Sequence, residues 1–282
     1  MKKLAVQLYV NQHLEHAIRS AAKAGFSAVS LCFDYDDTLW REDWEARILW
    51  IRRKLEEYGI ACVQTHLPCY DLKLSSEVLD PAMERAMDRG VLAAGMLGAA
   101  WNAYHCRTSI TRNYSPRVSM DENMPQLERL LKLAKENHTG IAVENLSLFP
   151  DVYWMRFLGS DVEDLVELCR RFDDPAMQIC WDFGHAHLLK YDLPELVRTA
   201  GKLIQCTHIH NNYQLQDDHN LPSVGTIDWP AAMDAMAEVG YDGDLTLEPR
   251  FPIPEVWETY LAHAHDCCVW LDQLLTAAKG GR

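Results

Sequence analysis

The chain has 282 residues, of which 48% are apolar, so it can bury the core of one large domain. It carries 27 Lys and Arg against 41 Asp and Glu, a formal net charge of −14. Such an acidic surface repels phosphate backbones and anionic lipids, so nucleic acid and membranes are not expected as partners.

The cysteines and the N-terminus indicate a reducing compartment. Nine cysteines form no Cys-x-x-Cys pair and lie within apolar segments, which is typical of buried free thiols. The first apolar stretch, residues 4–10, is too short for a signal peptide, and no apolar run approaches 18 residues. We therefore expect a cytoplasmic protein.

The first half of the chain alternates short apolar runs with longer amphipathic ones. The runs typical of strands are 4–10, 28–33, 62–67 and 102–106. The segments between them predict helices over 14–24, 44–58, 81–98 and 125–136, two of which are followed at once by Gly25 and Gly59.

The second half repeats the same alternation. Strands are predicted over 141–146, 178–182, 205–210 and 244–248. Helices are predicted over 162–172, 193–203, 228–239 and 255–278, with Asp161 and Asp228 as N-terminal caps.

Eight strands, each followed by a helix, predict a parallel sheet covered by helices. The number eight favours a closed (β/α)₈ barrel, a TIM barrel, over an open doubly wound sheet. No Gly-x-Gly-x-x-Gly follows the first strand, which also argues against a dinucleotide-binding fold. We expect a single barrel domain over residues 1–282.

Metal-ligating side chains stand at the ends of six consecutive predicted strands. Because parallel strands in a barrel end at the same rim, these side chains should converge there. A buried carboxylate also needs a partner, since its desolvation costs several kcal/mol. Oxygen and nitrogen donors together suit Mn²⁺, Co²⁺, Mg²⁺ or Zn²⁺. The six residues are His66, His105, Glu144, Asp182, His210 and Glu248, with His185 just beyond strand six.

Short motifs around these residues follow one another along the chain. They are Glu144-Asn145, Trp181-Asp182-x-x-His185, His208-Ile209-His210, Asp217-x-His219, Gly225-x-Ile227-Asp228-Trp229 and Glu248-Pro249. In this order they resemble the xylose isomerase-like barrels. That family includes sugar and sugar-phosphate isomerases and epimerases, with the type IV AP endonucleases as a distant branch.

The resemblance implies a metal-dependent isomerase or epimerase of sugars, sugar phosphates or polyol-derived ketones. It implies one divalent metal held by Glu144, Asp182, His210 and Glu248, which stabilises an enediolate. Glu144 and Glu248 are the implied acid and base on opposite faces of the substrate. His185 is implied as a substrate contact.

Further substrate contacts are expected from His66, His105, Trp181 and Arg250. The ketose 3-epimerases carry an arginine soon after the strand-seven histidine, whereas residues 211–219 contain none. Arg250 is the residue expected to replace it. The loop Pro222-Ser223-Val224-Gly225 also departs from the usual Pro-Gly-x-Gly of the family.

Three alternatives remain open from the sequence. A lyase of the inosose dehydratase type would use the same enolate chemistry. A phosphodiester hydrolase of the AP endonuclease type would need additional zinc ions, for which His66, His105, His185, Asp217 and His219 are the candidate ligands. A non-catalytic sugar-binding barrel is the third. The apolar residues of the last helix suit either packing on the barrel or a homo-oligomer.

Overall fold

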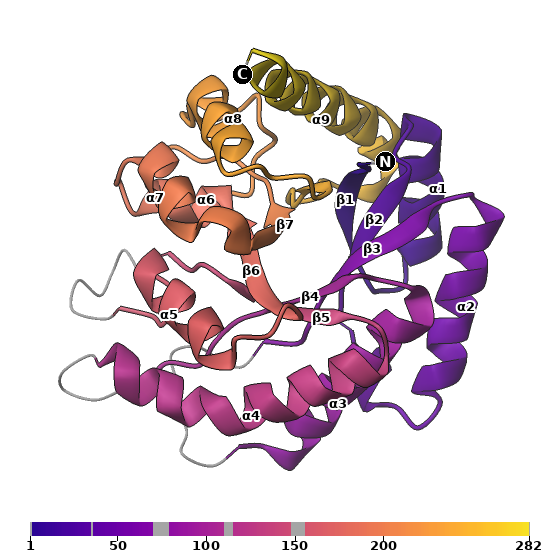
Figure 1. The fold of residues 1–282 in the computed structure, drawn as a ribbon. Coiled ribbons are helices and arrows are strands. Elements are labelled where there is room, and N and C mark those ends of the chain that lie inside the picture. Colours follow the sequence, from indigo (N-terminus) through magenta and orange to yellow (C-terminus); the bar gives the residue numbers. More distant parts are fainter. Residues whose placement is uncertain (1, 35, 70–78, 110–114, 148–155, 282) are drawn as a thin grey trace.

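The computed structural model describes residues 2–34, 36–69, 79–109, 115–147 and 156–281. Within these residues, an eight-stranded parallel sheet curves into a nearly closed barrel with helices around it (Figure 1). The predicted (β/α)₈ architecture is thus confirmed.

The strands follow the chain around the barrel. In the described part of the chain their order in the sheet is β7-β6-β5-β4-β3-β2-β1-β8, and neighbouring strands run parallel. Their bounds are β1 Leu4–Tyr9, β2 Ala28–Cys32, β3 Ala61–His66, β4 Trp101–Tyr104, β5 Gly140–Glu144, β6 Met177–Asp182, β7 Ile204–His208 and β8 Leu245–Leu247.

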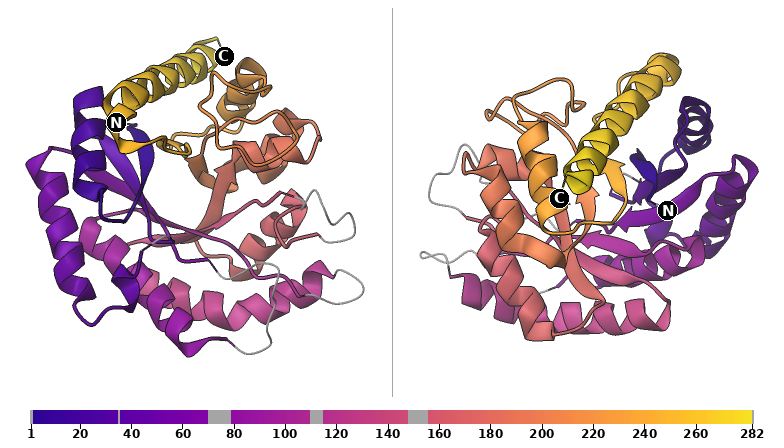
Figure 2. Two further views of the ribbon diagram at one scale, coloured as in Figure 1. Left: turned by 180° about the vertical axis from the view of Figure 1, so that it is seen from behind. Right: turned by 45° about the horizontal axis from the view of Figure 1, so that its top comes forward.

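The helices form the outer ring, and the last one, α9, lies beside α1 and α8 and completes it (Figures 1 and 2). The bounds are α1 Leu14–Ala24, α2 Trp44–Glu57, α3 Pro81–Leu97, α4 Pro116–Glu136, α5 Val162–Phe172, α6 Phe183–Leu188, α7 Leu193–Ala200, α8 Trp229–Glu238 and α9 Trp257–Gly280. Short 3₁₀ turns cover Thr38–Trp40, Gly201–Leu203 and Pro254–Val256. None of the helices in the described ranges is long and apolar enough to cross a membrane.

The barrel closes between β7 and β8 at the end that carries the polar residues. The Ile209 amide donates to the Thr246 carbonyl at 2.9 Å, and the Glu248 amide donates to the Ile209 carbonyl at 2.9 Å. Nearer the other end, the Thr207 hydroxyl bridges the two strands, donating to the Asp244 carbonyl and accepting from the Thr246 amide. These hydrogen bonds between β7 and β8 therefore place Glu248 beside the end of β7.

Alternate residues of each strand face the helices and the barrel interior. The large apolar side chains form one core between the sheet and the helices. Small clusters of Ala5, Ala28 and Val63, and of Ala103, Ala142, Cys180 and Cys206, stand apart from this core and line the interior. All nine cysteines are free, and all but the half-buried Cys69 are buried.

The predicted helix 125–136 begins earlier than expected. The structure extends α4 back to Pro116, with Pro125 inside it. The Ser115 hydroxyl accepts from the Val118 amide, and Pro116 occupies the first turn, where its missing N–H costs nothing. A proline inside a helix removes one backbone hydrogen bond, so Pro125 predicts a helix start rather than a helix interior. Burial of Leu127, Leu130 and Leu131 against the barrel offsets that loss.

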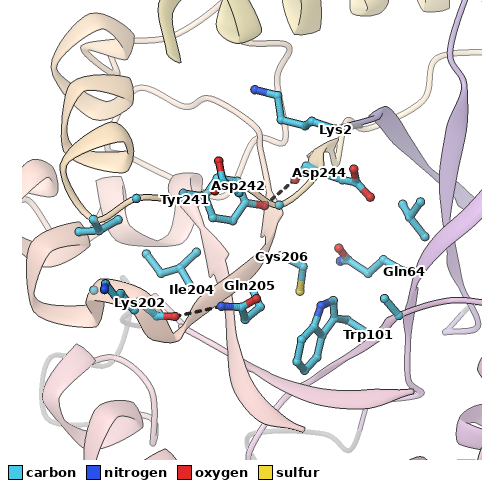
Figure 3. A pocket seen from close by; sticks show the side chains of 16 residues that line it. Lys2, Gln64, Trp101, Lys202, Ile204, Gln205, Cys206, Tyr241, Asp242 and Asp244 are labelled. Carbon is cyan, nitrogen blue, oxygen red and sulfur yellow. Dashed lines mark hydrogen bonds between the residues drawn. The ribbon is translucent and has the colours of Figure 1, made fainter. Parts of the chain in front are cut away.

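A cavity of about 590 Å³ opens at the opposite end of the barrel, near the N-terminal ends of the strands (Figure 3). Gln64, Trp101 and Cys206 line it, with Tyr241 and Asp244. Tyr241 donates its hydroxyl proton to the Asp244 carbonyl at 2.6 Å. This cavity contains none of the predicted site residues, and this end of a TIM barrel contributes to stability rather than chemistry.

Candidate metal centre and active site

Three carboxylates converge at the C-terminal end of the barrel. Glu144 and Asp182 are the last residues of β5 and β6, and Glu248 directly follows β8. His208, the last residue of β7, joins them. All four are buried, and one donor atom from each lies within 4.8 Å of the others.

The charge of this centre fits a divalent cation. Among the described residues, the ion-pair partners of the three carboxylates are all histidines, with no lysine or arginine. Glu144 Oε2 and Glu248 Oε2 are buried and make no hydrogen bond to a described residue. Buried negative charge without a fixed positive group is stable when a metal balances it.

Four histidines surround the carboxylate of Glu144. Burial raises the pKa of its carboxyl, but His208 and His105 outweigh this and hold the pKa well below its usual range. Glu144 Oε2 lies 3.2 Å from His105 Nε2 and 3.5 Å from His66 Nε2. The carboxylate is therefore ionised at neutral pH and available as a ligand or base.

Asp182 is fixed by the backbone around it. Its Oδ1 caps the short helix α6 by accepting from the His185 amide at 2.6 Å. The side chain of Asn145 donates to the Asp182 carbonyl at 2.8 Å and accepts from the Asp182 amide at 2.7 Å. These bonds leave Asp182 Oδ2 directed at His210 Nε2, 3.1 Å away.

Glu248 is oriented from inside the barrel. Gln7 Nε2 donates to Glu248 Oε1 at 2.6 Å, and Gln7 Oε1 accepts from the Ser30 hydroxyl at 3.2 Å. Glu248 Oε2 is left free to face the centre. Gln7 was not among the residues predicted from the sequence. The feature that could have indicated it is a polar residue among the apolar residues of β1, two positions after Ala5 and therefore on the interior side of the strand.

A second group of ligand atoms adjoins the first. It comprises His185, His210, Asp217 and His219. His185 and His219 each place Nδ1 against a backbone carbonyl, of Asn145 at 2.9 Å and of Glu248 at 3.0 Å. Their Nε2 atoms lie 3.3 Å and 3.0 Å from Asp217 Oδ2. Nδ1 therefore donates to a carbonyl in each ring, and Nε2, which faces the Asp217 carboxylate, is the inward-facing atom.

A third group lies on the other side of Glu144 and includes a residue that the sequence analysis did not single out. His66 donates from Nδ1 to the Leu67 carbonyl at 2.7 Å, and its Nε2 lies 3.3 Å from His105 Nε2. The thiol of Cys69 lies 3.3 Å from His105 Nδ1. Burial lowers the pKa of His105, but Cys69 and Glu144 outweigh this and raise it to about 10.

His210, the imidazole expected among the metal ligands, lies two residues beyond β7 with Asp182 on one side. Its Nε2 also lies 3.7 Å from Asp217 Oδ1, so this member of the second group contacts Asp182 of the first group as well. His210 packs directly on Gly184, where any side chain would overlap the imidazole. This close approach explains the glycine in the Asp182-Phe183-Gly184-His185 motif.

Two expected substrate contacts lie elsewhere. Trp181 packs in the core between the sheet and the helices, and its ring centroid lies 6.3 Å from that of Phe183 in an edge-on contact. It faces away from the barrel interior because Asp182, its neighbour in the strand, faces inward. Its prediction as a substrate contact is therefore corrected. The Arg250 side chain is exposed and lines a separate pocket of about 440 Å³ with Tyr9, Phe251 and Trp257.

Comparison with known proteins finds curated relatives that match part of the chain. The D-psicose 3-epimerase of Ruminiclostridium cellulolyticum is 20% identical over 139 residues, 49% of this chain and 44% of that protein. Uncharacterized protein MJ1311 of Methanocaldococcus jannaschii is 26% identical over 184 residues, 63% of this chain and 57% of that protein. The chain thus spans about half the length of these curated relatives.

Solved structures share the whole fold. A D-tagatose 3-epimerase-like protein superposes with a TM-score of 0.77 at 18% identity, over 98% of each chain. The family model described as "Xylose isomerase-like TIM barrel" matches residues 18–267. The chain belongs to this family of xylose isomerase-like TIM barrels.

Proposed function

We propose that the chain is a divalent-metal-dependent isomerase or epimerase of sugars or related ketones. The observation that supports this most is the set of three buried carboxylates without a lysine or arginine partner in the described residues. The sugar epimerases among its relatives and structural neighbours support the substrate class.

The proposed ligands are Glu144, Asp182, His210 and Glu248. A divalent metal held there would stabilise negative charge that develops on a carbonyl oxygen of the substrate. Glu144 and Glu248 are the proposed acid and base: one accepts the proton from the carbon next to the carbonyl, and the other delivers a proton to the opposite face. Gln7 holds Glu248 with one oxygen free for this transfer.

The histidines around Glu144 are proposed to bind the substrate. His66, His105 and His185 each present Nε2 or Nδ1 within 3.2–3.5 Å of a Glu144 oxygen. Hydroxyl groups of a sugar bound against Glu144 would therefore meet imidazole donors on both sides. The exposed Arg250 lines a separate pocket with Phe251 and Trp257.

The two glutamates provide the test. Glu144→Gln and Glu248→Gln should each lower the turnover of a panel of free and phosphorylated ketoses by about 10²–10⁴-fold, the usual contribution of a positioned acid or base. The exposed Glu136→Gln serves as the control and should leave turnover unchanged. Metal content is measured in parallel, because both glutamates are also proposed ligands. Wild-type turnover in either metal-loaded variant would refute the assignment.

The second ligand group favours one alternative, a hydrolase with several zinc ions. His185 and His219 have their Nδ1 atoms anchored on carbonyls and their Nε2 atoms directed at Asp217, an arrangement that suits a further metal. The net charge of −14 opposes a nucleic acid substrate. Metal analysis of the native protein separates the two functions: one ion per chain supports the isomerase or epimerase, and two or three support the hydrolase.

A further inference from the structure

The pocket that Arg250 lines opens on the same face of the barrel as the metal centre. It has a volume of about 440 Å³ and lies between the segment after β1 and the segment after β8. Tyr9, the last residue of β1, also lines it. We call this cavity the rim pocket. The loops at this face of a TIM barrel carry the substrate contacts, and those after strands seven and eight frequently bind phosphate.

The rim pocket adjoins the proposed catalytic residues. Tyr9 stands two positions beyond Gln7 on the same side of β1, and Gln7 donates to Glu248 Oε1. Glu248 and Arg250 are two residues apart in the sequence, at most about 7 Å of extended backbone. The Arg250 amide donates at 2.9 Å to the carbonyl of His219, whose ring belongs to the second group of ligand atoms. A substrate held at the metal centre can therefore extend its far end into the rim pocket.

The charge of the rim pocket is opposite to that of the whole chain. The formal net charge is −14, yet among the described residues that line this pocket none is acidic. Arg250 and His13 are its basic groups. The exposed Arg250 side chain makes no ion pair with a described residue. Because the acidic surface repels anions, basic groups gathered without acids mark the place where an anionic ligand is favoured.

Aromatic rings form a fixed wall of the rim pocket. Trp257 is buried, and its Nε1 donates to a backbone carbonyl at 2.8 Å. Phe251 contacts both Trp257 and Tyr9, with ring centroids 5.4 Å and 6.3 Å apart. The Tyr260 hydroxyl donates to the Arg250 carbonyl at 3.0 Å, which holds the backbone that carries the guanidinium. Pockets for small molecules typically combine such an apolar wall with a few polar groups that fix the orientation of the ligand.

We propose that the rim pocket binds a phosphate group at the far end of the substrate, so that phosphorylated ketoses are preferred to free ones. Arg250 binds the phosphate, because a guanidinium offers paired N–H donors that match two phosphate oxygens. The aromatic wall contacts the carbon chain between the phosphate and the carbonyl. That this phosphate belongs to a substrate rests on the proposed function, whereas the binding of phosphate in the pocket does not.

Phosphate binding can be measured without turnover. Calorimetric titration of the Mg²⁺-loaded full chain with glycerol phosphate, a phosphate monoester that has no carbonyl, should show saturable binding. Arg250→Gln should weaken this binding by about ten- to a hundredfold, the loss expected when a charged donor is removed. Arg250→Lys should restore part of it. Phosphate also binds metal ions directly, so the variants are compared at equal metal content.

The matched control is Arg53→Gln. Arg53 lies on an exposed face of α2 and, like Arg250, makes no ion pair with a described residue. This variant should bind glycerol phosphate as the wild type does, and thermal unfolding verifies that each variant is folded. Equal affinity in Arg250→Gln and the wild type, or an equal loss in Arg53→Gln, would overturn the proposal.

Kinetics tests whether the phosphate belongs to the substrate. For matched pairs of a ketose and its phosphate, the wild type should have the lower KM for the phosphate. Arg250→Gln should raise the KM of the phosphate by about ten- to a hundredfold more than that of the free ketose, with a smaller change in kcat, because the contact is present in both the ground state and the transition state. Equal KM values for the two members of each pair in the wild type would overturn the substrate assignment. If no ketose of either kind is turned over, the proposed function fails, while the glycerol phosphate titration still decides the role of the pocket.

Discussion

At the scale of single residues, the centre depends on close packing as much as on its ligands. Gly184 lies directly beneath His210, and the added methyl of alanine would overlap the ring. Gly184→Ala should therefore displace His210, weaken metal binding by at least about tenfold, and destabilise the fold by about 1–3 kcal/mol through overpacking. Gly59→Ala, where a methyl would meet open space but the backbone φ is +67°, controls for the loss of a glycine.

Calorimetric titration with Mn²⁺ and urea denaturation measure the two effects. A Gly184→Ala protein that binds metal as tightly as the wild type would show that His210 does not depend on this contact.

The residues at strand ends were predictable, and those that orient them were not. Glu144, Asp182 and Glu248 are charged residues at the ends of apolar runs, which is a strong signal. The contact of Gln7 with Glu248 depends on which strands lie opposite one another across the barrel, which no local pattern contains. Trp181 was assigned to the wrong face because its neighbour Asp182 was the one that faces inward.

At the scale of elements, Asn145 joins the ends of β5 and β6. Its side chain satisfies both the amide and the carbonyl of Asp182, which are buried. Asn145→Ala should cost about 1–3 kcal/mol for each backbone group left unpaired. Metal affinity should fall as well, because Asp182 loses its anchor.

The control is Asn137→Ala at the end of α4, where the side chain bonds, within the described residues, only to the Leu133 carbonyl of its own helix. Its urea midpoint should stay close to that of the wild type. Equal destabilisation by the two substitutions would contradict the anchoring role of Asn145.

The elements themselves were largely readable from the sequence. The apolar runs predicted all eight strands within a few residues, because a strand buried on both faces needs few polar side chains. The start of α4 was missed, because Pro125 gives a local stop signal that only tertiary packing overrides. The short helix α6 was also missed, since six residues carry no periodicity.

At the scale of the whole molecule, the site couples stability to pH when no metal is bound. Burial lowers the pKa of His219, but Asp217 and Glu248 outweigh this and raise it to about 9, and His105 rises to about 10. The unfolded value is 6.5, so the folded state binds these protons more tightly. This contribution to stability is complete below pH 6.5 and is lost as pH rises through 9 to 10.

The urea midpoint of the chelator-treated protein should accordingly fall between about pH 7 and pH 10. His219→Asn should reduce the size of the fall, which separates the site from other groups that titrate in this range. A midpoint that is constant or rises over this interval would contradict the coupling.

If one divalent metal and two glutamates move a proton on a ketose, a titration of metal-free protein with Mn²⁺ in D₂O will show it. Incorporation of deuterium at the carbon next to the carbonyl is followed by NMR for a panel of free and phosphorylated ketoses. We predict that exchange is absent without metal and rises to a plateau at one Mn²⁺ per chain. Exchange at full rate in the metal-free protein, or exchange that needs two or more ions per chain, would contradict the account.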